Sequence, residues 1–173
     1  MNIYWKALLF LLCVSFFHFG YDVTGWDFLK PFFGINESIF QHLKMAFWGY
    51  LLLSILEYFL LFKKELYREI KNFWYSRILS AIIVPWIVVL VWYLLPAIYG
   101  RVESLTFELF WALLATYLSG ILAIQIEKET EKTPFSTNTK AILLILLVIS
   151  AFMFVTFTYK LPWIDLFANP ETL

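Results

Sequence analysis

Five long apolar stretches, separated by shorter polar segments, constrain this chain more than any other feature of its sequence. They cover residues 3–20, 39–62, 73–99, 105–126 and 141–159. A helix rises about 1.5 Å per residue, so about 20 mostly apolar residues are needed to cross the hydrocarbon core of a bilayer. The pattern predicts an all-α integral membrane protein with five transmembrane helices. The connections are short, so we expect a single membrane domain over residues 1–173.

Composition supports this class and excludes others. Of the 173 residues, 62% are hydrophobic and 15% are charged, whereas soluble domains have about 45–50% apolar and about 25% charged residues. The 13 basic and 13 acidic side chains cancel, so no nucleic-acid partner is expected. The single cysteine, Cys13, cannot form an intramolecular disulfide. Within the first stretch, the apolar residues 7–17 follow Lys6 as in a signal peptide, but no small-residue cleavage site comes after them, so we expect an uncleaved first helix.

The basic side chains predict the orientation of the helices, because short cytoplasmic connections retain lysine and arginine. Eight of them gather at residues 63–77 and 128–140, and Lys6 is the ninth on that side. The other four lie at the opposite ends of the helices. With six and seven acidic residues, the two sides carry 9 − 6 = +3 and 4 − 7 = −3. We therefore expect the N-terminus inside and the C-terminus outside.

The outer connection between the first two helices, residues 21–34, mixes aromatic and polar side chains. Trp26 and Phe28 alternate with Asp27 and Lys30. Such a mixture is typical of segments at the level of the lipid headgroups. We expect an interfacial or re-entrant segment that either anchors the connection or covers a pocket. The amphipathic tail, residues 161–173, is expected to fold back over the same end.

Polar residues mark the beginning of the second helix. Asn36, Glu37 and Ser38 precede its apolar stretch. The first N–H groups of a helix have no partner within it and carry a partial positive charge. A capping side chain from Asn36 and the carboxylate of Glu37 suit that position.

The second helix carries two stripes of residues near its outer end, counted at about 100° per residue. The stripe of Glu37 includes Gln41 and Lys44. The second stripe lies on a different face and holds Ser38, His42, Ala46 and Gly49. Small residues allow close packing of helices in a membrane. The second stripe, with His42, is therefore predicted to face another helix.

Two charged residues within the second apolar stretch need partners. A lysine at position 44 is costly in lipid unless it reaches the outer interface or meets an acid. Glu37 and Glu108 are the candidate acids. Glu57, near the inner end, is expected to pair with the basic cluster that includes Lys63 and Lys64.

The only two histidines, His18 and His42, are predicted to lie at similar depths near the outer surface. Ser15, His18 and Asp22 share one face of the first helix at spacings of three and seven residues. Two imidazoles and a carboxylate suit a divalent transition metal with open positions. Asp22 is the expected carboxylate, because Glu37 and His42 fall on different stripes of a regular helix. A hydrogen-bonded packing cluster is the alternative.

The segment HFGYDVTGWDFLKPFFGINESIFQHLKMAF, residues 18–47, resembles an uncharacterised family of small prokaryotic multi-pass membrane proteins, a domain of unknown function. The shared pattern is a His-Phe pair, a Tyr-Asp pair, Asn-Glu-Ser and His-Leu-Lys. In this chain it comprises His18, Phe19, Tyr21, Asp22, Asn36, Glu37, Ser38, His42, Leu43 and Lys44. Gln41 stands where the family has an acidic residue. The resemblance implies a prokaryotic inner-membrane protein and a candidate site, but no activity.

Three functions remain open, and the sequence does not decide whether the protein is an enzyme. The first is binding of a small ligand, a lipid, a protein partner or a second copy of the chain at a polar pocket on the outer face. Its candidate residues are His18, Asp22, Asn36, Glu37, Ser38, Gln41, His42 and Lys44. The second is a membrane-embedded hydrolase, in which one divalent metal held by His18, His42 and a carboxylate lowers the pKa of a bound water. The third is a transporter or a transporter subunit, although no internal repeat is visible.

Overall fold

Five long helices make up most of the computed structural model, which describes residues 1–62, 72–100 and 104–169. They are α1 (Ile3–Thr24), α2 (Ile39–Phe62), α3 (Phe73–Tyr99), α4 (Leu105–Glu131) and α5 (Thr137–Tyr159). Two short 3-10 helices, η1 (Asp27–Leu29) and η3 (Asp165–Phe167), accompany them. No strand occurs in these described ranges. All five long helices are long and apolar enough to cross a membrane, so the chain is a multi-pass membrane protein.

Three helices extend beyond their apolar stretches. The α1 helix continues past residue 20 to Thr24, where Gly25 adopts φ 64° and its N–H donates to the carbonyl of Tyr21 at 2.8 Å. A glycine in the left-handed region is a common end of a helix, because other residues are strained there. The α4 helix continues to Glu131, and α5 begins at Thr137 after a cap from Ser136. These added turns are polar, so hydropathy alone does not predict them.

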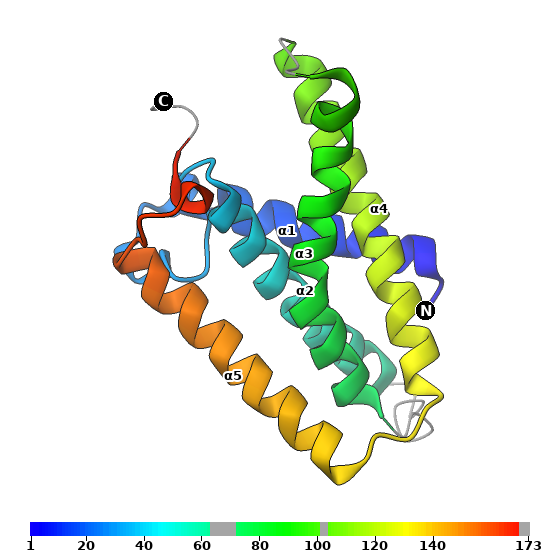
Figure 1. Ribbon diagram of the computed structural model, residues 1–173. Helices are drawn as coiled ribbons and strands as arrows, with labels where there is room; N and C mark the ends of the chain where they lie inside the picture. The colour runs from blue at the N-terminus through cyan, green and yellow to red at the C-terminus, as the bar shows by residue number, and fades with distance from the viewer. Residues whose placement is uncertain (63–71, 101–103, 170–173) are drawn as a thin grey trace.

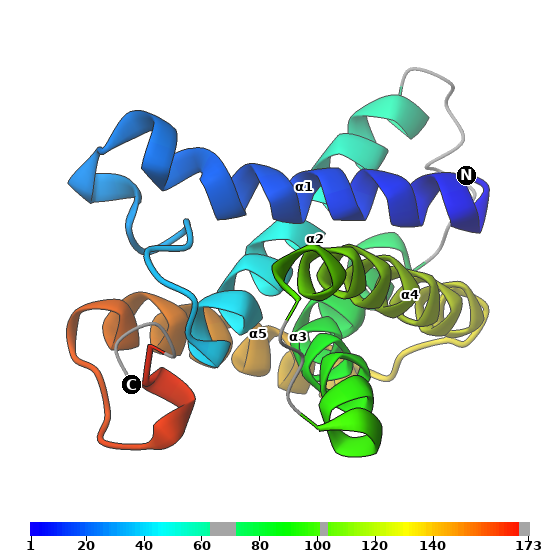
Figure 2. The ribbon, with the colours of Figure 1, turned by 90° about the horizontal axis from the view of Figure 1, so that it is seen from above.

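The core lies where α1, α2, α3 and α4 meet. The α3 and α4 helices pack antiparallel, α2 packs on α3, and α1 crosses both α2 and α4 (Figure 1 and Figure 2). Side chains from all four helices form one buried cluster, which comprises Ala7, Phe10, Cys13, Ala46, Tyr50, Leu53, Ala81, Val84, Val88, Ala123 and Ile124. The α5 helix lies outside this cluster, with only Leu143 and Thr158 buried.

Glycines allow α1 to approach its two neighbours closely. A Cβ atom at Gly49 of α2 would lie 3.0 Å from Cγ2 and 3.3 Å from the backbone N of Val14. A Cβ atom at Gly120 of α4 would lie 2.8 Å from Cδ1 of Phe10. The prediction that the stripe of His42 and Gly49 faces another helix is therefore confirmed, and that helix is α1.

One end of the molecule brings together the end of α1, the beginning of α2, the end of α5 and the tail (Figure 1). The rings of Phe40 and Phe167 lie 4.6 Å apart, and those of Phe47 and Phe154 lie 5.1 Å apart. The tail thus folds back onto α2 through η3. The connection between α1 and α2 lies at the same end and carries exposed, stacked rings of Trp26 and Phe28.

Candidate functional site

His18, Glu37 and His42 come together at the end of the molecule that holds the tail. Atom Nε2 of His18 lies 3.6 Å from Oε1 of Glu37, and Nε2 of His42 lies 3.4 Å from Oε2 of the same carboxylate. The two imidazole rings are 5.7 Å apart between centroids. One ligand atom from each residue can be chosen so that all three lie within 4.8 Å of one another. We call these three residues the triad.

The local fold before α2 explains why Glu37 reaches both histidines. The regular helix begins at Ile39, so Glu37 belongs to the connection rather than to the helical stripe of Gln41. The side-chain oxygen of Asn36 accepts the N–H of Ser38 at 3.0 Å, which forms a turn just ahead of the helix. Asn36 therefore orders the turn instead of capping an N–H inside the helix.

Asp22 is not the carboxylate that accompanies the histidines. It lies in the added turn of α1, and its side chain is exposed. The expectation that Asp22 is the carboxylate of the histidine pair assumed a regular helix from residue 37, whereas the structure groups Glu37 with His18 and His42. Once Glu37 leaves the helix, its side chain is free to turn towards α1.

A hydrogen bond orients the ring of His42. Its Nδ1 atom lies 3.0 Å from the carbonyl oxygen of Ser38. Because a carbonyl only accepts, this contact selects the tautomer with the proton on Nδ1 and leaves the lone pair of Nε2 towards Glu37. Metal-binding histidines commonly use such a bond on the nitrogen that does not bind the metal. No partner for Nδ1 of His18 occurs among the described residues.

The triad is partly open to its surroundings. Its side chains are 30%, 41% and 39% exposed, in chain order. Contact with His18 lowers the pKa of the Glu37 carboxyl; partial burial opposes this effect, and the electrostatic interaction with His42 adds to it. The carboxylate form that a metal requires is therefore favoured. Two imidazole nitrogens and one carboxylate form a donor set suited to zinc and other first-row transition metals.

Gln41 and Lys44 face away from the triad. Lys44 is fully buried and donates to the carbonyl of Lys30 at 2.7 Å and to Oγ1 of Thr158 at 3.2 Å. Of the alternatives expected for this lysine, pairing with Glu37 or Glu108 does not occur among the described contacts, whereas the ammonium does reach the connection between α1 and α2 at the Lys30 carbonyl. Gln41 is also fully buried, and its amide atoms have no hydrogen-bond partner among the described residues.

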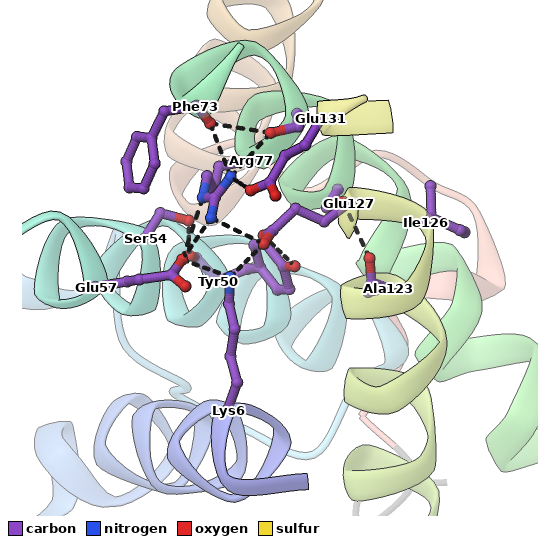
Figure 3. Close-up of polar contacts among 12 residues, drawn as sticks. Lys6, Tyr50, Ser54, Glu57, Phe73, Arg77, Ala123, Ile126, Glu127 and Glu131 are labelled. Carbon is purple, nitrogen blue, oxygen red and sulfur yellow. Dashed lines mark hydrogen bonds and ion pairs between the residues drawn. The ribbon is translucent and has the colours of Figure 1, made fainter. Parts of the chain in front are cut away.

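A second polar group, absent from the sequence-based candidates, lies at the other end of α2. Lys6, Glu57, Arg77 and Glu127 meet there, with side chains that are 1% to 4% exposed, and Glu131 completes the group at its edge. We call these five residues the buried ionic cluster (Figure 3). They come from α1, α2, α3 and α4, so the cluster joins all four helices of the core.

Each cation of the cluster contacts more than one acid. Lys6 lies 2.5 Å from Oε2 of Glu57 and also contacts Glu127. Arg77 lies 3.0 Å from Glu57 and 3.2 Å from Glu127, and it contacts Glu131 as well. The hydroxyl of Tyr50 donates to Glu127 at 2.7 Å. Charges buried in this way are tolerated when they are paired and hydrogen-bonded.

The sequence contains a signal for this cluster. Lys6, Glu57 and Arg77 lie inside three separate apolar stretches, and charges within a membrane-spanning helix generally need a partner on another helix. The expected partners of Glu57, Lys63 and Lys64, lie outside the described residues. Its described partners are Lys6 and Arg77, which come from different helices and are 51 and 20 residues away along the chain.

Comparison with known proteins gives a family and no activity. No curated protein and no solved structure matches this chain. One family model, described as a family of unknown function (DUF6512), matches residues 3–172, nearly the whole length. The match agrees with the resemblance to an uncharacterised family of multi-pass proteins, although it does not test the prokaryotic origin. The chain belongs to this family of unknown function, DUF6512.

Proposed function

We propose that this membrane protein binds one divalent transition-metal ion through His18, Glu37 and His42. The observation that carries the proposal is the convergence of three ligand atoms within 4.8 Å from two helices and the connection between them. With the N-terminus inside, as the lysines and arginines predict, the site faces the outside of the cell. The metal is then the small ligand of the outer polar pocket expected from the sequence.

The distances within the triad are compatible with a metal ion. Ligand atoms about 2.0–2.1 Å from a tetrahedral zinc ion lie roughly 3.3 Å from each other. The two histidine-to-carboxylate distances, 3.6 and 3.4 Å, are close to that separation but end on different oxygens of Glu37. One ligand atom from each residue lies within 4.8 Å of the others, so binding one ion would draw the three side chains closer together. The hydrogen bond from Nδ1 of His42 to the Ser38 carbonyl also favours metal binding. Metal-binding histidines usually make such a bond with the ring nitrogen that does not bind the metal.

Metal analysis of the purified protein tests the proposal. The protein is purified in mild detergent, dialysed against zinc at about pH 7.5, where free imidazole is mostly neutral, and then freed of unbound metal. We expect one zinc ion per chain, and loss of zinc in the variants His18→Ala, His42→Ala and Glu37→Gln. Asp22→Asn is the matched control, because Asp22 belongs to the same sequence motif but lies outside the triad.

Two results would refute metal binding at the triad. One is the absence of zinc and cobalt from the folded native protein after loading. The other is a loss of metal in Asp22→Asn as large as in Glu37→Gln. Bound cobalt gives a second measurement, because its visible absorption bands report coordination by nitrogen and oxygen. These bands should disappear when His18, Glu37 or His42 is replaced.

Metal-dependent hydrolysis is a second candidate function. Catalytic zinc sites commonly have three protein ligands and leave a position for water, whose pKa the metal lowers towards neutrality. The triad supplies three such ligands, and its partial exposure gives a substrate access to them. Zinc-dependent cleavage of p-nitrophenyl acetate, lost in Glu37→Gln and kept in Asp22→Asn, would support hydrolysis. Metal binding without any such cleavage would leave the protein as a metal-binding protein.

A further inference from the structure

A cavity of about 370 Å³ lies between α2, α3 and α5, and none of the triad residues lines it. Its lining comprises the middle of α2, Ile78 of α3 and Leu147 of α5, together with Phe17 and Trp74. Residues 48–55 of α2 line its length, which corresponds to about 10 Å of helix. The cavity thus borders about two turns of a membrane-spanning helix.

The α5 helix contacts other helices near both of its ends. Near its end, Phe154 packs on Phe40 and Phe47, and Thr158 accepts a hydrogen bond from Lys44. Near its beginning, the ammonium of Lys140 lies 5.2 Å from the ring centre of Tyr75. Between these ends, Leu147 of α5 lines the cavity.

The polar atoms around the cavity are already engaged. The hydroxyl of Ser54 donates to the carbonyl of Tyr50 at 2.7 Å, and the indole N–H of Trp48 donates to the carbonyl of Pro31 at 3.2 Å. Arg77 contacts three carboxylates of the buried ionic cluster. Arg77 is the cation among the described lining residues, and its charge is already neutralised by these carboxylates. The described lining therefore favours an apolar occupant over a phosphate or carboxylate.

We propose that this cavity binds one acyl chain of a bilayer lipid, which completes the packing of α5 against α2 and α3. A helix of a second copy is about 10 Å across with its side chains, so the cavity of about 370 Å³ could receive only side chains from it. An acyl chain is narrower, and the bilayer around five spanning helices supplies it directly.

Native mass spectrometry tests this site. The protein is reconstituted into dioleoylphosphatidylcholine nanodiscs and extracted in mild detergent, and the lipid retained per chain is counted. We expect one lipid on the native protein. Leu147→Trp fills the cavity and should retain less than about a tenth of that lipid. Ile145→Trp is the matched control, because Ile145 is an exposed residue of the same helix outside the cavity, and it should retain the lipid.

The outcomes separate the acyl chain from its alternatives. Equal retention by the native protein and both variants, or no retained lipid on the native protein, overturns the proposal. A native dimer that Leu147→Trp separates into monomers also overturns it, since a second copy would then occupy the cavity. If Leu147→Trp does not fold, Leu51→Phe fills the cavity from α2 with a smaller increase in volume, and the same outcomes apply.

Discussion

The ammonium of Lys6 on α1 lies 2.5 Å from Oε2 of Glu57 on α2, in a site where the two side chains are 1% and 4% exposed. Removing one partner of a buried pair leaves the other charge uncompensated, which generally costs about 3–5 kcal/mol. We therefore predict that Lys6→Met destabilises the protein by about that amount. Unfolding in mixed detergent micelles, followed by circular dichroism, measures the change.

Lys132→Gln is the control for Lys6→Met, because Lys132 pairs with Glu129 at 2.9 Å on the exposed surface of the last turn of α4. Exposed pairs contribute about 0–1 kcal/mol, so this variant should be nearly as stable as the native protein. A loss from Lys6→Met no larger than that from Lys132→Gln would show that Lys6 is not paired inside the core.

Arg77→Lys tests whether the shape of the guanidinium matters as well as its charge. Arg77 reaches Glu57, Glu127 and Glu131 through different nitrogen atoms. A lysine keeps the charge but has a single nitrogen, so it cannot bridge three carboxylates in the same geometry. We expect Arg77→Lys to lose about 1–3 kcal/mol of stability, less than Arg77→Met, in the same unfolding measurement. Equal stability of Arg77→Lys and the native protein would contradict the bridging role.

Replacing Lys44 is expected to cost less stability than replacing Lys6, although both lysines are buried. Among the side chains that the structure describes, no carboxylate contacts Lys44, whose described partners are the Lys30 carbonyl and Thr158. Lys44→Met loses two hydrogen bonds but leaves no buried acid unpaired, and it removes the cost of burying an ammonium group. We predict that it destabilises by at least about 2 kcal/mol less than Lys6→Met. Equal losses from the two substitutions would mean that Lys44 also pairs with an acid.

The helices could be predicted from the sequence more fully than the contacts between them. Apolar runs locate all five spans, and the small residues around Gly49 correctly predict a closely packed neighbour. Hydropathy does not reveal that α1 continues to Thr24, because its last turn is polar and ends at the left-handed Gly25. Nor does periodicity say which helices are neighbours, so the pairing of Lys6 with Glu57 could not be derived from spacing.

The candidate site could be predicted in part. The two histidines were expected at one depth near one end of the molecule, and the structure brings them together. The carboxylate was misassigned because the choice between Asp22 and Glu37 depends on where α2 begins. Because α2 begins at Ile39, two residues after Glu37, and Asn36 forms a turn ahead of it, Glu37 reaches His18. In a helix that began at residue 37, Glu37 would instead lie on the stripe of Gln41.

The titration of Glu37 reports the triad in solution. Contact with His18 lowers the pKa of this carboxyl below its ordinary value of about 4.3. A lowered pKa in the folded state means that the stabilising contribution is complete above the unfolded value and is lost as the pH falls through the folded value. Carbon-13 NMR of labelled glutamate in detergent should show this low pKa, and His18→Ala should raise it. A pKa of Glu37 unchanged by His18→Ala, or raised equally by Asp22→Asn, would contradict the contact.

Gly49 tests the close approach of α1 and α2. A side chain at this position would meet both the Cγ2 atom and the backbone of Val14, so α1 has to move. Overpacking of this kind costs about 1–3 kcal/mol, and we predict a loss of stability at the upper end of this range for Gly49→Leu.

Gly25→Leu is the control for a large side chain in open space: no atom lies within 4 Å, and its φ of 64° alone should cost about 1–2 kcal/mol. Val14→Ala removes the nearest atom and should recover part of the loss in Gly49→Leu. Purely additive effects of Val14→Ala and Gly49→Leu on stability would contradict the contact, because substitutions at residues in contact generally have non-additive effects.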